Sequence, residues 1–285
     1  MSITVSIKAI IEEKLKQFED LPALPSVYIK LKELIERDRS TREIASLLEN
    51  DQALAAKVLK LANSALFSGL KEVTDLNLAI TRLGMRTIET LVLTTATGSF
   101  YVAKSPADLE ILSKLWGHAA ACGAAGRRLA VRIRYPDPEK AFLSCLLHDI
   151  GKAVILNAVS RLRIGGMNGA VLNHELKLEL IQGFHEEIGY KLIKSWNLHE
   201  DLALCARFHS CPEQLDQPNI LVNIANLANL ISRKLGESLH PYANESLVDN
   251  PLAIQYEIGD LEMASMLVEI EDQMNQLKSL VAKTR

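Results

Sequence analysis

Apolar residues recur at spacings of three and four along most of the chain, and long alternating runs of β-branched residues are absent. This spacing places apolar side chains on one face of a helix, so the pattern predicts an all-α fold. The helices expected in the N-terminal part cover residues 5–19, 27–37, 53–62, 75–83 and 86–98, with one more beginning after Ser40. In the C-terminal part we expect a helix of about 25 residues after Pro106, one holding His148, and helices over 154–163, 168–181, 184–196, 200–210, 219–235 and 261–282.

Residues with strong capping preferences mark several of these helix boundaries. Ser26, which follows a double proline, is placed to cap the second helix, and Ser40, with a glutamate shortly after it, is placed to cap the third. Asp51 is expected to cap the next helix, and Gly84 suits a left-handed helix end. The signals predict short helices stacked against one another.

A change in composition near residue 103 divides the expected helices into two groups. We predict an N-terminal helical lobe over 1–103, a second helical lobe over 104–235, and a final segment over 236–285. That final segment contains a loop and then an amphipathic helix with heptad-like spacing. This last helix either packs back onto its own lobe or pairs with a partner.

Composition excludes several classes of protein. The chain has 285 residues, 48% of them hydrophobic, so it can bury a full core and is not disordered. A net charge of -3 gives no electrostatic footprint for nucleic acid or an anionic membrane, and the arginines around 127–134 are expected to form a solvated helix face. The four cysteines form no CxxC pair and fit reduced thiols. The chain also shows no long apolar span and no signal-peptide pattern, so we expect a cytoplasmic protein.

An adjacent histidine and aspartate, His148 and Asp149, follow the almost wholly apolar run 141–147. The run predicts that the pair is buried, where an unpaired carboxylate is costly. Two kinds of partner are open: a metal ion, for which imidazole plus carboxylate is a common ligand set, or a private hydrogen bond between the two side chains.

Three further histidines point inward on their predicted helices: His118, His185 and His209. If they converge with His148 and Asp149, the site has ligands for one or two divalent ions. The remaining histidines are expected at the surface; these are His174, His199 and His240.

A row of amides also shares one helix face in the segment 219–235, at Asn219, Asn223 and Asn226. Such a row either points to a specific site or forms hydrogen bonds with neighbouring backbones.

The order of these motifs resembles the HD metal-dependent phosphohydrolase superfamily, and more closely its HDOD branch, the HD-related output domains of bacterial signalling proteins. The resemblance covers residues from about 18 to 235. The stretches that carry it are 21–25, 44–51, 59–64, 79–84, 115–118, 146–152, 185–189, and Trp196 with His209 after it.

The resemblance implies an HD-like helical bundle preceded by a smaller helical lobe, with one or two divalent ions (Fe, Mn, Zn or Mg). The implied metal ligands are His118, His148, Asp149, His185, His209 and Asn226. Catalytic HD enzymes have an aspartate where this chain has Asn226, so the implied site has lost a charge and its metal affinity should fall.

Two functions therefore follow from the resemblance. The first is a regulatory, signal-transducing module with a degenerate HD site that contacts a signalling protein of unknown identity. The alternative is a metal-dependent phosphomonoesterase or phosphodiesterase, in which Asp149 helps to hold the ion and Lys152 stabilises the phosphoryl charge. Nucleic acid and membrane are not expected as partners.

Overall fold

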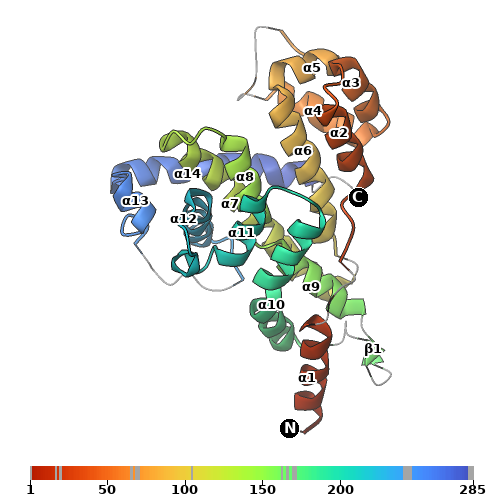
Figure 1. Ribbon diagram of the computed structural model, residues 1–285, viewed down its shortest axis with the longest axis vertical. Helices are drawn as coiled ribbons and strands as arrows, with labels where there is room; N and C mark the ends of the chain where they lie inside the picture. Colours follow the sequence, from red (N-terminus) through yellow and green to blue (C-terminus); the bar gives the residue numbers. More distant parts are fainter. Residues whose placement is uncertain are drawn as a thin grey trace. The chain divides into compact units, whose positions relative to one another are not determined.

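The described residues of the computed structural model are almost entirely helical, which confirms the predicted all-α class (Figure 1). It describes residues 2–16, 18, 21–64, 67, 71–103, 105–161, 163–164, 167–168, 172–239 and 246–281. The two short strands β1 (Arg163–Ile164) and β2 (Met167–Asn168) form one antiparallel pair. The helices are α1 (Ser2–Lys16), α2 (Ser26–Glu36), α3 (Thr41–Glu49), α4 (Gln52–Ala62), α5 (Leu76–Leu83), α6 (Met85–Gly98), α7 (Leu109–Arg132), α8 (Pro138–Leu147), α9 (Ile150–Arg161), α10 (His174–Ser195), α11 (Glu200–Phe208), α12 (Ile220–Lys234), α13 (Pro251–Gln255) and α14 (Asp260–Val281).

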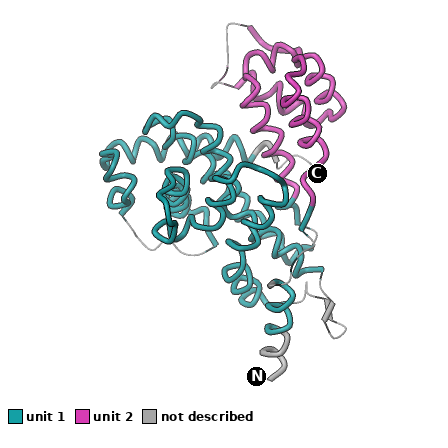
Figure 2. The backbone as a smooth tube through the Cα atoms, viewed as in Figure 1, with its two compact units in different colours: residues 1–22, 100–278 teal, residues 23–99, 279–285 magenta. Residues whose placement is uncertain are grey.

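The chain divides into two compact units, coloured separately in Figure 2. One comprises residues 1–22 and 100–278, and the other comprises residues 23–99 with 279–285. The first unit therefore includes α1 and most of the segment after residue 235. The sequence-based division into 1–103, 104–235 and 236–285 placed both of these segments outside the HD-like lobe.

Local capping shapes the helices of the smaller unit. Ser40 caps α3 in a capping box with Glu43, and Asp51 caps α4 by accepting a hydrogen bond from the Leu54 amide. Gly84 ends α5 with a φ of 77°, which an L side chain adopts only with strain. The prediction for Ser26 was wrong: Pro25 holds the cap position of α2, and no side chain makes a capping hydrogen bond there.

Close contact between α9 and α10 places two parts of the candidate site together. A Cβ at Gly151 would overlap the carbonyl oxygen of His185 and lie 2.8 Å from the Gly189 nitrogen, so the two backbones approach without a side chain between them. The predicted break between residues 181 and 184 was wrong, because α10 runs unbroken through Gly183. Packing along its length outweighs the modest helix penalty of one glycine.

The last helix, α14, packs back onto the larger unit, as one of the two sequence alternatives proposed. Met266 and Ile270 are buried in its core. Arg128 pairs with Glu269 at 2.6 Å on this helix, so part of the basic cluster around 127–134 binds acidic groups instead of facing solvent alone. The predicted loop over 236–259 contains the short helix α13.

Among the described residues, one helical stretch, Pro138–Arg161, covers α8 and α9 and passes the length and composition test for a membrane span. However, 78% of its most apolar window of 18 residues is buried inside the protein. Its apolar character is thus explained by its place in the core, and a cytoplasmic location stays a prediction.

Candidate metal centre

Four histidine side chains from four helices meet around one buried carboxylate, that of Asp149. His118 lies in the middle of α7, and His148 caps the end of α8, immediately before Asp149. His185 comes from α10 and His209 from the end of α11. Their exposed fractions are 4% for His118, 0% for His148, 2% for Asp149, 2% for His185 and 1% for His209.

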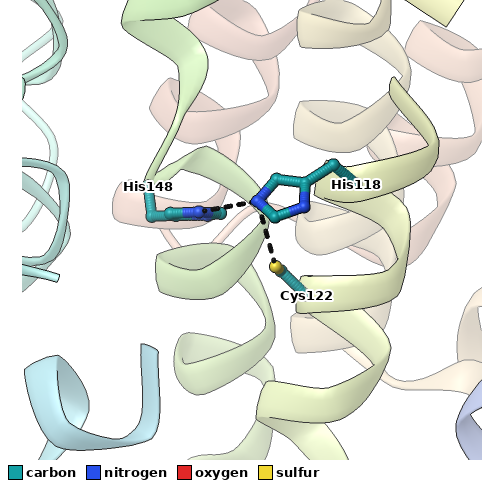
Figure 3. A group of neighbouring side chains, drawn as sticks. All are labelled: His118, Cys122 and His148. Carbon is teal, nitrogen blue, oxygen red and sulfur yellow. Dashed lines mark hydrogen bonds between the residues drawn. The ribbon is translucent and has the colours of Figure 1, made fainter. Parts of the chain in front are cut away.

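One carboxylate oxygen of Asp149, Oδ2, faces two imidazoles and a lysine. The Nε2 atoms of His118 and His148 lie 3.2 and 3.3 Å from it, and they lie 3.3 Å from each other. Lys152, in the first turn of α9, donates a hydrogen bond to the same oxygen at 2.5 Å. Figure 3 shows the His118 and His148 rings turned toward each other.

The other oxygen, Oδ1, faces His185 and His209, whose Nε2 atoms lie 3.4 and 3.5 Å away. This oxygen is buried and accepts no hydrogen bond from the described residues. A buried acceptor without a donor is rare, and a bound cation would satisfy this oxygen.

Each of the four rings is anchored through Nδ1 to a backbone carbonyl. His118 bonds to the Glu237 oxygen at 2.7 Å, His148 to Cys145 at 2.6 Å, His185 to Gln182 at 3.0 Å and His209 to Cys205 at 3.1 Å. Because a carbonyl only accepts, Nδ1 carries the hydrogen and Nε2 is the atom left to face Asp149. This is the arrangement of metal-binding imidazoles, whose second nitrogen is held by a neighbour.

The charges of the cluster compensate one another when no metal is bound. Burial opposes ionisation of Asp149, but Lys152 and His148 hold its pKa well below the usual range. Burial likewise opposes protonation of His118, yet Cys122 and Asp149 outweigh it and raise the His118 pKa to about 10. A proton on the Nε2 atom of His118 then stands where a metal ion would bind.

The opposite side of the cluster stays neutral. Burial, followed by the charge of Lys152, lowers the pKa of His185 to about 4, and burial with His148 lowers the pKa of His209. Neutral imidazoles are the form that binds metals, so this side needs no proton release before an ion enters.

The residues fit a divalent ion. In a tetrahedral site with metal–nitrogen distances of about 2.0 Å, neighbouring ligand atoms are about 3.3 Å apart. The triangle formed by Asp149 Oδ2 and the Nε2 atoms of His118 and His148 has sides of 3.2, 3.3 and 3.3 Å. Together with the orphaned Oδ1 atom, it makes His118, His148 and Asp149 suitable for one ion, and Asp149, His185 and His209 for a second.

A cavity of about 150 Å³ opens beside the cluster. Three of the imidazoles line it, and its other polar walls include Lys152, Gln182, Ser210, Asn229 and Arg233. Its lysine on α9 and its arginine on α12 suit an anionic occupant.

Asn226 is used differently from the predicted ligands. Its amide nitrogen donates to the His209 carbonyl at 2.8 Å, and its amide oxygen accepts from Asn250 at 2.9 Å. Asn250 caps α13 with its own oxygen, so its nitrogen is the group that meets Asn226. The amide of Asn226 thus joins the α13 segment to the backbone of His209, and a role as metal ligand stays a prediction.

The structure brings together His118, His148, Asp149, His185, His209 and Lys152, as the sequence indicated. Their roles as ligands or catalytic groups stay predictions. His174 and His199 are exposed, as expected, and His240 lies outside the described residues.

Sequence reasoning missed Arg233, which lines the cavity, and treated Cys122 only as a core thiol. The spacing of four between His118 and Cys122 on one helix was the signal that these two side chains share a face.

A family model of the HDOD domain matches residues 21–212, so the chain belongs to the HDOD domain family. A protein of Treponema pallidum (strain Nichols), described as uncharacterized, is 28% identical over 244 residues, which cover 81% of this chain and 46% of that protein. The chain thus spans less than half the length of that relative.

Two solved structures from Shewanella amazonensis SB2B share the fold. One, provisionally assigned as a metal-dependent phosphohydrolase, is 21% identical with a TM-score of 0.74, covering 96% of this chain and 100% of that one. The other, provisionally assigned as a phosphohydrolase, is 26% identical with a TM-score of 0.65, covering 96% of this chain and 98% of that one.

Proposed function

We propose that this chain is a regulatory module of a signal-transduction pathway, which contacts a protein partner and holds a divalent ion without turnover. The observation that carries the proposal is the amide of Asn226. It replaces the acid that catalytic HD enzymes are expected to supply from this helix, and both ends of its amide are bonded to His209 and Asn250.

The charge of the cluster follows from this replacement. Among the predicted ligands only Asp149 is anionic, and Lys152 already pairs with it at 2.5 Å. A dication held by neutral imidazoles and one shared carboxylate is undercompensated in a buried site, which weakens its binding. A site of this kind retains the scaffold of the HD family but binds the metal ion that catalysis needs more weakly.

Exposed apolar side chains near the C-terminal end provide a surface for a protein partner. Leu261 and Val268, seven residues apart on one face of α14, are 91% and 63% exposed, and Ile254 on α13 is 63% exposed. Contiguous exposed apolar patches mark contact sites, so we place the partner's contact at these three side chains.

A metal-dependent phosphohydrolase is the second candidate, and the cavity favours it. Lys152 and Arg233 face this space beside three imidazoles, where they would hold the oxygens of a phosphoryl group. A bound divalent ion would supply Lewis-acid polarisation of that group. The relative at 26% identity that is provisionally assigned as a phosphohydrolase supports the same candidate.

Metal analysis of the purified protein, combined with phosphatase and phosphodiesterase assays in Mn²⁺, Fe²⁺ and Mg²⁺, tests the choice. Bound metal without turnover is the expected result. Turnover that disappears in His148→Ala, while the circular dichroism spectrum is unchanged, would instead establish the enzyme.

Asn226→Asp sharpens the test, because it restores the missing carboxylate. We expect tighter metal binding in this variant, and Asn223→Asp on the same helix is the control for a general effect of charge. An unchanged metal affinity in Asn226→Asp would contradict the idea that the lost acid limits the site.

A further inference from the structure

Cys122 lies against the metal centre on the side of Asp149 Oδ2. It is fully buried on α7, one turn after His118, and its Sγ atom lies 3.7 Å from His118 Nε2 (Figure 3). The ligand atoms of His118, Cys122 and His148 all lie within 4.8 Å of one another. A thiol, two imidazoles and the Asp149 carboxylate therefore meet in one place.

We propose that Cys122 is a thiolate ligand of the ion held by His118, His148 and Asp149, and that this ligand makes the position selective for Zn²⁺ over Mg²⁺ and Mn²⁺. The proposal rests on the proposed function in one respect, since it needs the HD site to hold a metal. Thiolate and imidazole ligands favour zinc, whereas Mg²⁺ and Mn²⁺ favour oxygen ligands.

The distances match a tetrahedral site with one sulfur. With a zinc–sulfur distance of about 2.3 Å and a zinc–nitrogen distance of about 2.0 Å, the sulfur and a neighbouring nitrogen are about 3.5 Å apart. The separation of Cys122 Sγ from His118 Nε2 is 3.7 Å. Three further edges of this set, among His118, His148 and Asp149, are 3.2 to 3.3 Å. The Cys122 sulfur also lies within 4.8 Å of the ligand atom of His148, so a rotation of its side chain would bring it to the ion.

The thiolate also corrects the charge that Asn226 leaves uncompensated. Asp149 contributes one negative charge, and Cys122 would contribute the second, so the ion and its ligands are neutral together. On binding, the S–H bond of Cys122 and the Nε2–H bond of His118 break, bonds from the sulfur and the nitrogen to zinc form, and the two protons leave for the solvent. A neutral cluster costs the least desolvation free energy when it is buried.

Two other buried cysteines serve as controls that distinguish a ligand role of Cys122 from simple core packing. Cys145 and Cys205 are as deeply buried as Cys122 and belong to the same core cluster, but neither joins a metal-ligating group of the described residues. In the metal-free protein the Cys122 thiol has a core partner as well, the Ala228 carbonyl at 3.6 Å. Loss of core packing should therefore affect Cys122→Ala and Cys145→Ala alike, whereas loss of a ligand should affect only the first.

Cobalt substitution of the full chain tests the proposal. The Co²⁺-loaded wild type should show a near-ultraviolet thiolate-to-cobalt band with intense visible bands, and Cys122→Ala should lose the ultraviolet band. Zn²⁺ affinity, measured by competition with a chromophoric chelator, should fall by at least tenfold in Cys122→Ala and should be unchanged in Cys145→Ala. Retention of the band and of the affinity in Cys122→Ala would overturn the proposal.

Zinc X-ray absorption of the wild type needs no variant, so it decides the case even if Cys122→Ala does not fold. A sulfur neighbour at about 2.3 Å supports the thiolate, and a shell of nitrogen and oxygen alone excludes it. A wild type that binds metal without sulfur overturns only the role of Cys122. A wild type that binds neither Zn²⁺ nor Co²⁺ overturns this role and the metal-holding part of the proposed function together.

Discussion

Two buried carboxylates of the larger unit, Asp108 and Asp149, have almost the same exposure, 3% and 2%, and each is paired with a lysine. They differ in what surrounds the two oxygens. Lys177 donates to one oxygen of Asp108 at 2.7 Å and Ser160 donates to the other at 2.8 Å. The Oδ1 atom of Asp149, in contrast, accepts no hydrogen bond from the described residues.

The lysines differ in the same sense. The Lys177 side chain is 3% exposed, so its charge is enclosed together with that of Asp108. The Lys152 side chain is 15% exposed and lines the cavity. The closed pair of Asp108 and Lys177 fixes the start of α7 against α9 and α10. The open pair of Asp149 and Lys152 leaves one carboxylate oxygen of Asp149 for another ligand. Completeness of hydrogen bonding, more than burial or charge, separates the structural acid from the candidate functional one.

Replacement of each lysine in turn tests this difference between Asp108 and Asp149 and should give the largest effect. Lys177→Met should lower the free energy of unfolding by about 3–5 kcal/mol, because it leaves Asp108 charged, buried and without its counterion. Metal content should stay the same. Lys152→Met should cost less stability, because the Asp149 carboxylate retains two imidazoles beside the same oxygen and because the lysine that is lost lies near solvent. This variant should not weaken metal binding. Urea unfolding and metal analysis of both variants check the pair, and equal losses of stability would remove the distinction.

Gly151→Ala acts on the region of Asp149 through the backbone. The new methyl group would overlap the His185 carbonyl, so α9 and α10 must separate. Such overpacking typically costs about 1–3 kcal/mol, and the shift of His185 should also reduce metal affinity. Gly183→Ala on α10 is the control, because no atom lies within 4 Å of its added carbon. It should gain up to about 1 kcal/mol in helix propensity. Thermal unfolding distinguishes the two, and an unchanged melting temperature in Gly151→Ala would contradict the close packing.

Much of this comparison could be predicted from local sequence, because helix spacing decides which side chains share a buried face. The apolar run before His148 and the stripes of His118, His185 and His209 predicted that these side chains are buried, but left open whether they converge. Local spacing carries no information on contacts between distant segments. The carbonyl of Glu237 that orients His118 comes from 119 positions further along the chain. The same limit hid the partner of Asn226, because Asn250 lies in a segment that was predicted to be a loop.

The pH dependence of the metal-free protein should come mainly from the region of Asp149. The His185 pKa of about 4 lies below that of an unfolded histidine, about 6.5. The unfolded chain therefore binds more protons between these values, and stability should fall as the pH drops from about 6.5 to 4. The His118 pKa is raised to about 10, so its contribution is complete below about 6.5 and is lost as the pH rises toward 10.

Stability of the metal-free protein should thus be greatest near pH 6.5, measured by denaturant unfolding across the pH range in the presence of a chelator. His185→Ala should flatten the acid side of the curve and His118→Ala the alkaline side. A curve with the same slopes in wild type and variants would show that the cluster does not titrate as the structure indicates.

The smallest expected effect concerns the link from α13 to the metal centre. Asn250→Ala removes the cap of α13 and the hydrogen bond to the Asn226 amide, which should cost about 1 kcal/mol of stability. Because Asn226 still donates to the His209 carbonyl, only a slight loss of metal affinity is expected. Asn173→Ala, which removes the cap of α10 without touching Asn226, is the control with a similar loss of stability. If metal affinity falls equally in both variants, the amide chain through Asn226 does not position His209, and the open side of Asp149 is held by its helices alone.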